Sequence, residues 1–221
     1  MRYIQQRLGC SVIGFLLLTG FFYHLNLGYF GDIYLDSIQP IEIFNNKTSG
    51  TYENITIDNL PGSWNNWTWA VTQPWCSGLG TLETPYLIEG HTLSIDENFD
   101  GIHISNSQGI NFKIKDCIFI WDGVIPAGTG ISLINTTNGV IFNNTIYDIS
   151  VGIEINGCEN LIIRNNTIYN TMEGLSLFQS HFNELSENII HNNVYGIRLE
   201  GSNNNSIYLN FFLKNGIHSI D

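Results

Sequence analysis

The sequence predicts an all-β fold, a single-stranded parallel β-helix made of about five to six coils of 22 residues. Two motifs support this prediction, because both return at the same interval. A glycine motif begins at positions 130, 152, 174 and 196, where the chain reads GISL, GIEI, GLSL and GIRL. An asparagine motif keeps the same step, with its second Asn at 144, 166, 188 and 210. Within the repeats, apolar and polar residues alternate as in a strand, and no segment has helical spacing.

Residues 1–30 are predicted to be a signal peptide or a signal-anchor helix. Arg2 and Arg7 precede an uncharged apolar run from Leu8 to Tyr23, which is the order found in secretory signals and anchors. The run is short for a membrane span, and no small-x-small cleavage site follows it. An uncleaved anchor is therefore favoured slightly over a cleaved signal, and a buried helix of a soluble domain is disfavoured. Everything after about Asp32 is expected outside the cytoplasm.

Residues 31–100 are predicted to form an irregular strand and cap segment ahead of the repeats. Four tryptophans crowd this segment, at positions 64, 67, 69 and 75. Flat rings on a rigid rod suit stacking against sugar faces, whereas the apolar end of a solenoid needs a cover. For Trp67, Trp69 and Trp75 the covering role is favoured.

Residues 101–221 are predicted to be the β-helix repeats, in which side chains 22 residues apart lie above one another. One column consists of Asn144, Asn166, Asn188 and Asn210. A lone buried amide is costly, but amides in a column can bond one another, so this asparagine ladder is interpreted as structural. An earlier coil places Cys117 at the head of the column. Each motif glycine is expected to adopt a left-handed backbone at a coil corner.

The chain ends part-way through a coil, at GIHSID, without the polar cap that protects the edge of a solenoid. Three explanations are open at this stage. The chain could be a truncated gene product, a fragment of a longer structural surface protein, or a protein whose end is covered by another subunit.

The repeats resemble the NosD-type right-handed parallel β-helix proteins of the pectin-lyase-like superfamily, also described as carbohydrate-binding and sugar-hydrolase (CASH) repeats. The matching residues are the G-I-x-L … I-x-x-N-x-I repeats from 101 to 220. The segment WCSGLGTLETPYLIEG at 75–90 is also similar to the entry segment of secreted members, notably in archaea. The resemblance implies a right-handed coil, an extracytoplasmic location and ligands on the flank of the helix. Relatives include polysaccharide lyases, pectin hydrolases, epimerases and a copper-maturation factor.

Composition argues against a nucleic-acid partner, because a net charge of −12 with only 8 Lys and Arg leaves no basic patch for phosphates. The sequons of a glycoprotein fit an external location. They begin at Asn46, Asn54, Asn66, Asn135, Asn143, Asn165 and Asn204. The four cysteines, at 10, 76, 117 and 158, do not make a disulfide framework at this length.

No catalytic group is assigned from the sequence. One outward column contains Ser132, Glu154, Ser176 and Arg198. It lacks the paired carboxylates of a glycan hydrolase, and no Asp cluster suggests calcium. The nearest constellation is Glu159 with His181, one coil apart, which could exchange protons but is better explained as a surface ion pair. No His or Cys spacing suggests a metal, and no cofactor is expected.

Tyr147, Tyr169 and His191 share an outward column and are the candidates for ligand binding, since exposed rings can stack on sugars. The leading hypothesis is a non-catalytic binding or scaffold module displayed outside the cell, either secreted or anchored to the membrane through its N-terminal segment. Its partner would be a glycan or a cell-surface protein. The alternative is a polysaccharide lyase, hydrolase or epimerase in which Glu159 or another carboxylate acts.

Overall fold

The computed structural model describes residues 15–18, 21–24, 50–95, 99–121, 123 and 126–220. The chain divides into two compact units, residues 1–45 and 46–221, and each is described by itself. The first unit contains an antiparallel pair of strands, β1 (Phe15–Leu18) and β2 (Phe21–His24). The predicted signal or anchor helix is therefore not confirmed, and most of residues 1–30 lies outside the described residues. Among the described residues, no helix has the length and apolar character to cross a membrane.

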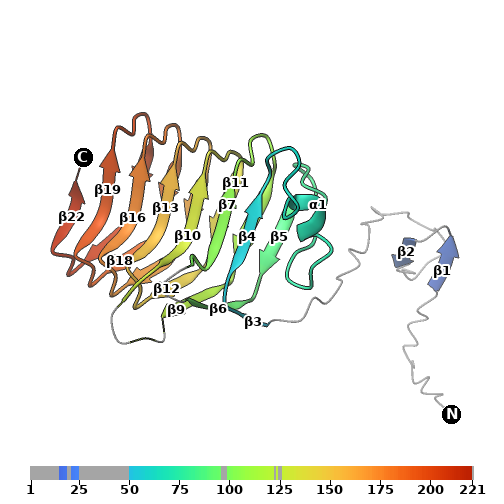
Figure 1. Ribbon diagram of the computed structural model, residues 1–221, viewed down its shortest axis with the longest axis horizontal. Coiled ribbons are helices and arrows are strands. Elements are labelled where there is room, and N and C mark those ends of the chain that lie inside the picture. Colours follow the sequence, from blue (N-terminus) through green and yellow to red (C-terminus); the bar gives the residue numbers. More distant parts are fainter. Residues whose placement is uncertain are drawn as a thin grey trace, which may run out of the picture. The chain divides into compact units, whose positions relative to one another are not determined.

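The second unit is a parallel β-solenoid whose described part contains six coils, each with a strand in three sheets (Figure 1). Sheet I contains β4 (Ile55–Asp58), β7 (Ile102–Ser105), β10 (Thr129–Ile134), β13 (Val151–Asn156), β16 (Glu173–Phe178), β19 (Tyr195–Glu200) and β22 (Ile217–Ile220). Sheet II contains β5 (Tyr86–Glu89), β8 (Phe112–Lys115), β11 (Gly139–Phe142), β14 (Ile162–Arg164), β17 (Glu184–Ser186) and β20 (Ser206–Tyr208). Sheet III contains β3 (Thr51–Tyr52), β6 (Thr92–Ile95), β9 (Ile118–Trp121), β12 (Thr145–Tyr147), β15 (Thr167–Tyr169), β18 (Ile189–His191) and β21 (Phe211–Leu213). The predicted all-β parallel solenoid is confirmed.

Strand pairing aligns neighbouring coils so that like side chains stack. In sheet I, Ile153 pairs with Leu175, and Glu154 pairs with Ser176. Because successive side chains of a strand point to opposite faces, Ile153 and Ile155 are buried in the core while Glu154 between them faces outward. The core is accordingly a set of Ile and Leu columns inside the three sheets, and the outer faces carry the polar residues.

The corner between sheets II and III holds a file of buried asparagines. Nδ2 of Asn144 donates to Oδ1 of Asn166 at 3.0 Å, and Asn166 donates to Asn188 in the same way at 3.0 Å. Asn188 continues the file to Asn210 at 2.9 Å. The backbone N–H of Cys117 donates to Oδ1 of Asn144 at 3.0 Å, which places Cys117 at the head of the file. These amides satisfy one another inside the protein and are not available to a ligand.

The motif glycines are required by space and not by a left-handed backbone. None of Gly130, Gly152, Gly174 and Gly196 has a positive φ, so the prediction of a left-handed glycine is wrong. A Cβ on Gly152 would instead lie 2.4 Å from the carbonyl oxygen of Gly174 in the next coil. The left-handed corner positions are occupied mainly by asparagines, such as Asn165 with φ 58°, which tolerate this conformation better than most residues.

An inserted segment, residues 59–85, separates β4 from β5 and contains one helical turn, α1 (Trp67–Ala70), capped by Asn66. Figure 1 places α1 beside β4 and β5, at the end of the array away from β22. The buried Trp67 ring stacks on Tyr86 with centroids 4.7 Å apart, and Trp75 is buried in the same core cluster. The parallel ladder thus begins upstream of residue 101, since strands β3 to β6 precede the first recognisable repeat.

Candidate functional site

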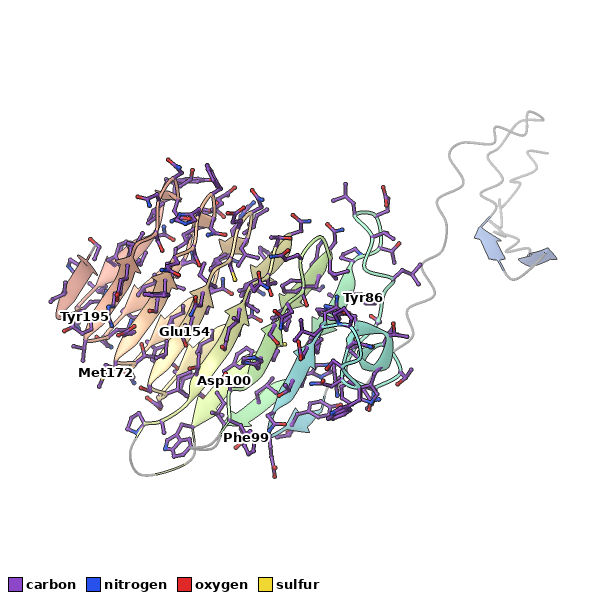
Figure 2. All side chains as sticks on the ribbon, turned by 45° about the horizontal axis from the view of Figure 1, so that its top comes forward. Tyr86, Phe99, Asp100, Glu154, Met172 and Tyr195 are labelled. Atoms are coloured by element: carbon purple, nitrogen blue, oxygen red, sulfur yellow. The ribbon has the colours of Figure 1, made fainter. Side chains whose placement is uncertain are left out.

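The outer face of sheet I carries a group of charged side chains in two neighbouring files. Residues two places after the motif glycines form the first file, which contains His103, Ser132, Glu154, Ser176 and Arg198. Residues directly before the glycines form the second file, which contains Thr129, Val151, Glu173 and Tyr195. Asp100 holds the corresponding position before Gly101. Figure 2 shows Asp100, Glu154 and Tyr195 on the same face of the solenoid.

Arg198 holds two carboxylates on this face. Its Nη1 donates to Oε1 of Glu173 at 2.8 Å, and its Nη2 donates to Oε2 of Glu200 at 3.2 Å. The Glu173 side chain is only 15% exposed, so this pair is partly protected from solvent screening. The three charged groups help to line a concavity of about 270 Å³. Its other residues are Val151, Glu154, Asn156, Ser176, Leu177 and Phe178.

The surroundings of Glu154 disfavour the ionised form of its carboxyl group. Partial burial raises the pKa of the Glu154 carboxyl, and the negative charges of Asp100 and Glu173 raise it further, while His103 opposes the shift. Asp100 in turn contacts His103, with 3.1 Å between Oδ2 and Nδ1. A carboxyl with a raised pKa beside an imidazole can exchange protons with a bound molecule.

Ser132 lies between His103 and Glu154 in the first file and is only 4% exposed. Its neighbours Ile131 and Leu133 point into the core, so the Ser132 hydroxyl is directed towards the outer face. Among the described residues, the buried side-chain polar atom without a hydrogen-bond partner is Nε1 of Trp121, so the Ser132 oxygen is not a buried unpaired atom.

The predicted ligand-binding residues Tyr147, Tyr169 and His191 lie in one file on the outer face of sheet III. Their rings are stacked in parallel, with centroids 5.0 Å apart between the two tyrosines and 4.9 Å apart between Tyr169 and His191. Where two of these rings are neighbours in the file, each covers the face of the other. A ligand would meet ring edges here, which is a poor platform for stacking against a sugar.

Glu159 and His181 are neighbours through a parallel bridge at the corner between sheets I and II. The ion pairs of the described residues do not include these two side chains. Nδ1 of His181 instead accepts a hydrogen bond from the backbone N–H of Asn203 at 3.0 Å. The two residues therefore stand side by side without forming a proton-transfer pair.

The period of 22 residues does not predict Asp100 and Glu173 as neighbours of Glu154. Periodicity relates residues of the same column, whereas these carboxylates belong to two neighbouring columns. The available signal was the residue before each motif glycine, which also repeats every 22 residues from position 129 and includes Glu173. The residue directly before each motif glycine and the residue two places after it, taken together, indicate this group of charged side chains.

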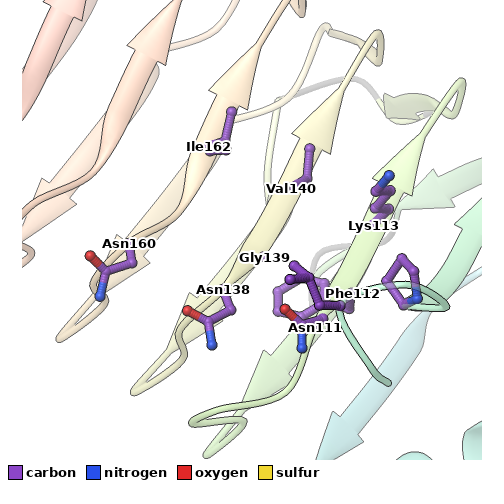
Figure 3. A pocket seen from close by; sticks show the side chains of 10 residues that line it. Asn111, Phe112, Lys113, Asn138, Gly139, Val140, Asn160 and Ile162 are labelled. Carbon is purple, nitrogen blue, oxygen red and sulfur yellow. The ribbon is translucent and has the colours of Figure 1, made fainter. Parts of the chain in front are cut away.

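A second concavity, of about 220 Å³, lies on the outer face of sheet II beside the inserted segment (Figure 3). Its lining is mainly apolar and amide in character. It consists of Leu82, Pro85, Asn111, Phe112, Lys113, Asn138, Gly139, Val140, Asn160 and Ile162. Lys113 is the one charged residue of this lining, so the concavity lacks the interacting charges that mark sheet I.

A sequence model of the family described as "Periplasmic copper-binding protein (NosD)" matches residues 80–220. Copper in proteins is held by imidazole, thiolate or thioether groups that converge on one point. The part of the chain that the structure describes contains no cluster of three His, Cys, Asp or Glu side chains able to hold a metal. Burial also raises the pKa of the Cys117 and Cys158 thiols to about 11, which disfavours their thiolates. These residues do not fit a copper centre.

In structure, the chain is similar to the A-module of the mannuronan C-5 epimerase AlgE6 from Azotobacter vinelandii, with a TM-score of 0.36 and 11% sequence identity. The similarity covers 61% of this chain and 58% of the epimerase module. No curated protein matches the chain in sequence. The NosD match, by contrast, extends over well more than half of the chain and over most of its coils. The chain therefore belongs to the NosD family, whose description as periplasmic supports an extracytoplasmic location.

Proposed function

We propose that this protein is an extracytoplasmic β-helix module that binds a glycan on the outer face of sheet I. The observation that carries the proposal is the concavity in which the Arg198 pairs, Glu154 and Asn156 lie beside the half-buried apolar side chains of Val151 and Phe178. Saccharide sites combine a few fixed polar groups for the hydroxyls with apolar surface for the carbon faces. Both kinds of group are present in this concavity.

Two exposed apolar side chains extend this face. Phe99 is 52% exposed and precedes Asp100, and Met172 is 57% exposed and precedes Glu173. Figure 2 shows both residues along the same part of the solenoid as Asp100 and Glu154. Because parallel coils rise by about 4.8 Å, a linear polymer lying along the axis would meet a new row of side chains at each coil. The face therefore suits an extended chain better than a compact small molecule.

A glycan array probed with the purified full-length protein tests this proposal. We expect binding to at least one saccharide class, weakened about tenfold in Glu173→Gln because Arg198 and the concavity lose an anchoring charge. Glu187→Gln is the matched control, since Glu187 also pairs with an arginine, Arg164, but lies off sheet I. Absence of binding to any glycan, with capture of a cell-surface protein instead, would refute the ligand class.

A second function, turnover of a polysaccharide by a lyase, hydrolase or epimerase, is favoured by Glu154 and by the Asp100–His103 contact. A carboxyl with a raised pKa is suited to general acid catalysis. In this case Glu154→Gln abolishes product formation from a panel of neutral and acidic polysaccharides. Glu159→Gln serves as the control at the other candidate carboxylate. Inactivity of the unmodified protein on the whole panel would eliminate the enzyme.

We also propose that residues 1–30 attach the protein to the membrane, a proposal that rests on the Arg-flanked apolar run of the sequence. Membrane fractionation of cells that produce the chain with and without residues 1–30 tests it. Recovery of both forms in the same soluble fraction would contradict membrane attachment.

A further inference from the structure

We propose that the concavity on sheet II is a second saccharide site, and that its ligand carries an anionic group, a carboxylate or a sulfate ester, at Lys113. The site lies on a different sheet from the glycan site proposed above and goes beyond that function. Three features of the lining carry the inference: a cation without an ion pair, amide side chains without partners, and apolar surface beside both.

The first feature is Lys113, a positive charge without a partner in an acidic protein. The chain has a net charge of −12, yet the lining of this concavity contains no carboxylate. On the same strand, Nζ of Lys115 pairs with Glu89 at 2.7 Å. Among the described residues, no ion pair or hydrogen bond involves the ammonium group of Lys113. An anionic ligand group would be attracted to it without having to displace a protein carboxylate.

The second feature is a file of three amides along one side of the concavity. Asn111, Asn138 and Asn160 occupy the same position in three successive coils, since the residues next to them are paired from coil to coil. Figure 3 shows these amides in one row, beside a second row that begins with Lys113. A ligand lying along the solenoid axis would therefore meet both rows.

Two of these amides are available to a ligand. Nδ2 of Asn111 donates to the carbonyl oxygen of Gly80 at 3.3 Å. The side chains of Asn138 and Asn160 are exposed and form no hydrogen bond within the part of the chain that the structure describes. A side-chain amide has both donors and an acceptor, which is the combination that sugar hydroxyls require.

The third feature is apolar surface beside the amides. Leu82 is 79% exposed and Ile162 is 37% exposed, and Pro85 and Val140 line the same concavity. The carbon faces of a sugar ring can pack on such side chains while its hydroxyls bond the amides. Parallel coils rise by about 4.8 Å, which is close to the advance of one sugar along an extended chain. Each coil can therefore contact one sugar.

The coil that follows the concavity gives the ligand a direction. Phe182 continues the amide file into this coil and is 57% exposed, so its ring is available for stacking on a sugar. Glu184 follows Ile162 in the second row and accepts a hydrogen bond from the hydroxyl of Tyr208 at 2.6 Å. A carboxylate at this end would repel an anion, so the anionic group of the ligand is expected at the other end, beside Lys113.

The test is calorimetric titration of the full-length protein with two matched pairs of hexasaccharides. The first pair is a galacturonic acid hexamer and its methyl ester, and the second is a galactose hexamer with and without a sulfate ester on each sugar. The members of a pair share a backbone and differ in charge. We expect at least one acidic hexamer to bind about tenfold more tightly than its neutral counterpart, and the pair that shows the difference identifies the anionic group.

Variants assign the preference to sheet II. Lys113→Gln is expected to abolish the preference for the acidic hexamer. Lys214→Gln is the matched control and should keep it, since Lys214 also lacks an ion pair among the described residues but follows β21 of sheet III. Asn160→Gly should weaken the acidic and the neutral hexamer alike, several-fold, because an amide is lost while glycine keeps the left-handed backbone at φ 56°.

Equal affinity within both pairs, or no binding of any hexamer, would overturn the site on sheet II and leave the function proposed for sheet I to the glycan array. A preference for the acidic hexamer that survives in Lys113→Gln would also overturn it, because the anionic group would then bind elsewhere on the protein.

Discussion

Asn166 and Asn188 lie one coil apart and are joined by two hydrogen bonds to a single oxygen. The backbone N–H of Asn166 donates to Oδ1 of Asn188 at 2.9 Å, and Nδ2 of Asn166 donates to the same atom at 3.0 Å. Nδ2 of Asn166 also donates to the carbonyl oxygen of Ile141 at 2.9 Å. One side chain therefore ties three successive coils together at a corner where no water reaches.

Asn166→Ala is expected to lower the free energy of unfolding by roughly 3–5 kcal/mol, because several buried polar groups lose their partner at once and each costs about 1–3 kcal/mol. The groups left without a partner include the backbone N–H and Nδ2 of Asn144. Urea denaturation followed by circular dichroism measures the loss. Asn165→Ala is the control, since Asn165 is exposed, and it should cost only about 1 kcal/mol for its left-handed backbone. Equal losses for the two variants would contradict the structural role of the file.

Gly174→Ala tests whether the motif glycines are required by space. A Cβ there would lie 2.5 Å from the carbonyl oxygen of Gly196 and 2.9 Å from Cγ2 of Ile190, so β16 and β19 would have to separate. We expect a loss of about 3 kcal/mol or more from this overpacking. Gly157→Ala provides the opposite case, since Gly157 has φ 62° and open space around it, and it should cost about 1 kcal/mol. A smaller loss at Gly174 than at Gly157, measured by the urea midpoint, would show that backbone angle matters more.

The comparison of Gly174 with Asn166 shows what the sequence can predict about this fold. A period of 22 residues is enough to state which residues lie above one another, because parallel pairing preserves the register from coil to coil. The period does not predict the structural role of the residue at a given position. Glycine is required at 174 by the short distance to the carbonyl oxygen of Gly196 in the next coil, and the repeat pattern does not contain that distance.

The candidate site was harder to predict for a related reason. Glu154 and Glu173 lie on different coils and in different columns, so their interaction depends on how two columns lie side by side on the sheet. The inserted segment around Trp67 has no counterpart in later coils, so periodicity contained no information about its contact with Tyr86. The repeat predicts contacts between residues at the same position of successive coils. It does not predict contacts between residues at different positions.

His91 makes the stability of the N-terminal coil dependent on pH. Its buried ring lies 3.1 Å from the carbonyl oxygen of Trp75 through Nε2, and Nδ1 accepts the backbone N–H of Gly50 at 3.4 Å. These contacts fit the neutral ring with the proton on Nε2. Burial lowers the pKa of His91 below its ordinary value of 6.5, although the carbonyl of Trp75 and the charge of Glu89 oppose the shift.

Because the pKa is lower in the folded state, the contribution of His91 to stability is fully present above pH 6.5 and is lost as the pH falls below that value. The free energy of unfolding should therefore decrease on acidification through this window, as measured by urea midpoints at a series of pH values. His91→Gln should show a shallower decrease, since glutamine does not titrate. Parallel curves for the two proteins would mean that other groups cause the pH dependence.

Tyr169 is expected to matter for stability and not for glycan binding. It is the central ring of the stack and has a ring on each face, at 5.0 Å and 4.9 Å, so a sugar cannot stack on it without displacing Tyr147 or His191. Tyr169→Ala should lower the free energy of unfolding by about 1–2 kcal/mol, through the loss of two ring contacts. Tyr147→Ala removes one of those contacts and should cost less. Both variants should keep the affinity of the unmodified protein on the glycan array, because the proposed ligand lies on sheet I. A loss of affinity in Tyr169→Ala at temperatures where the variant is folded would instead place the ligand on sheet III and return the stacked rings to the binding site.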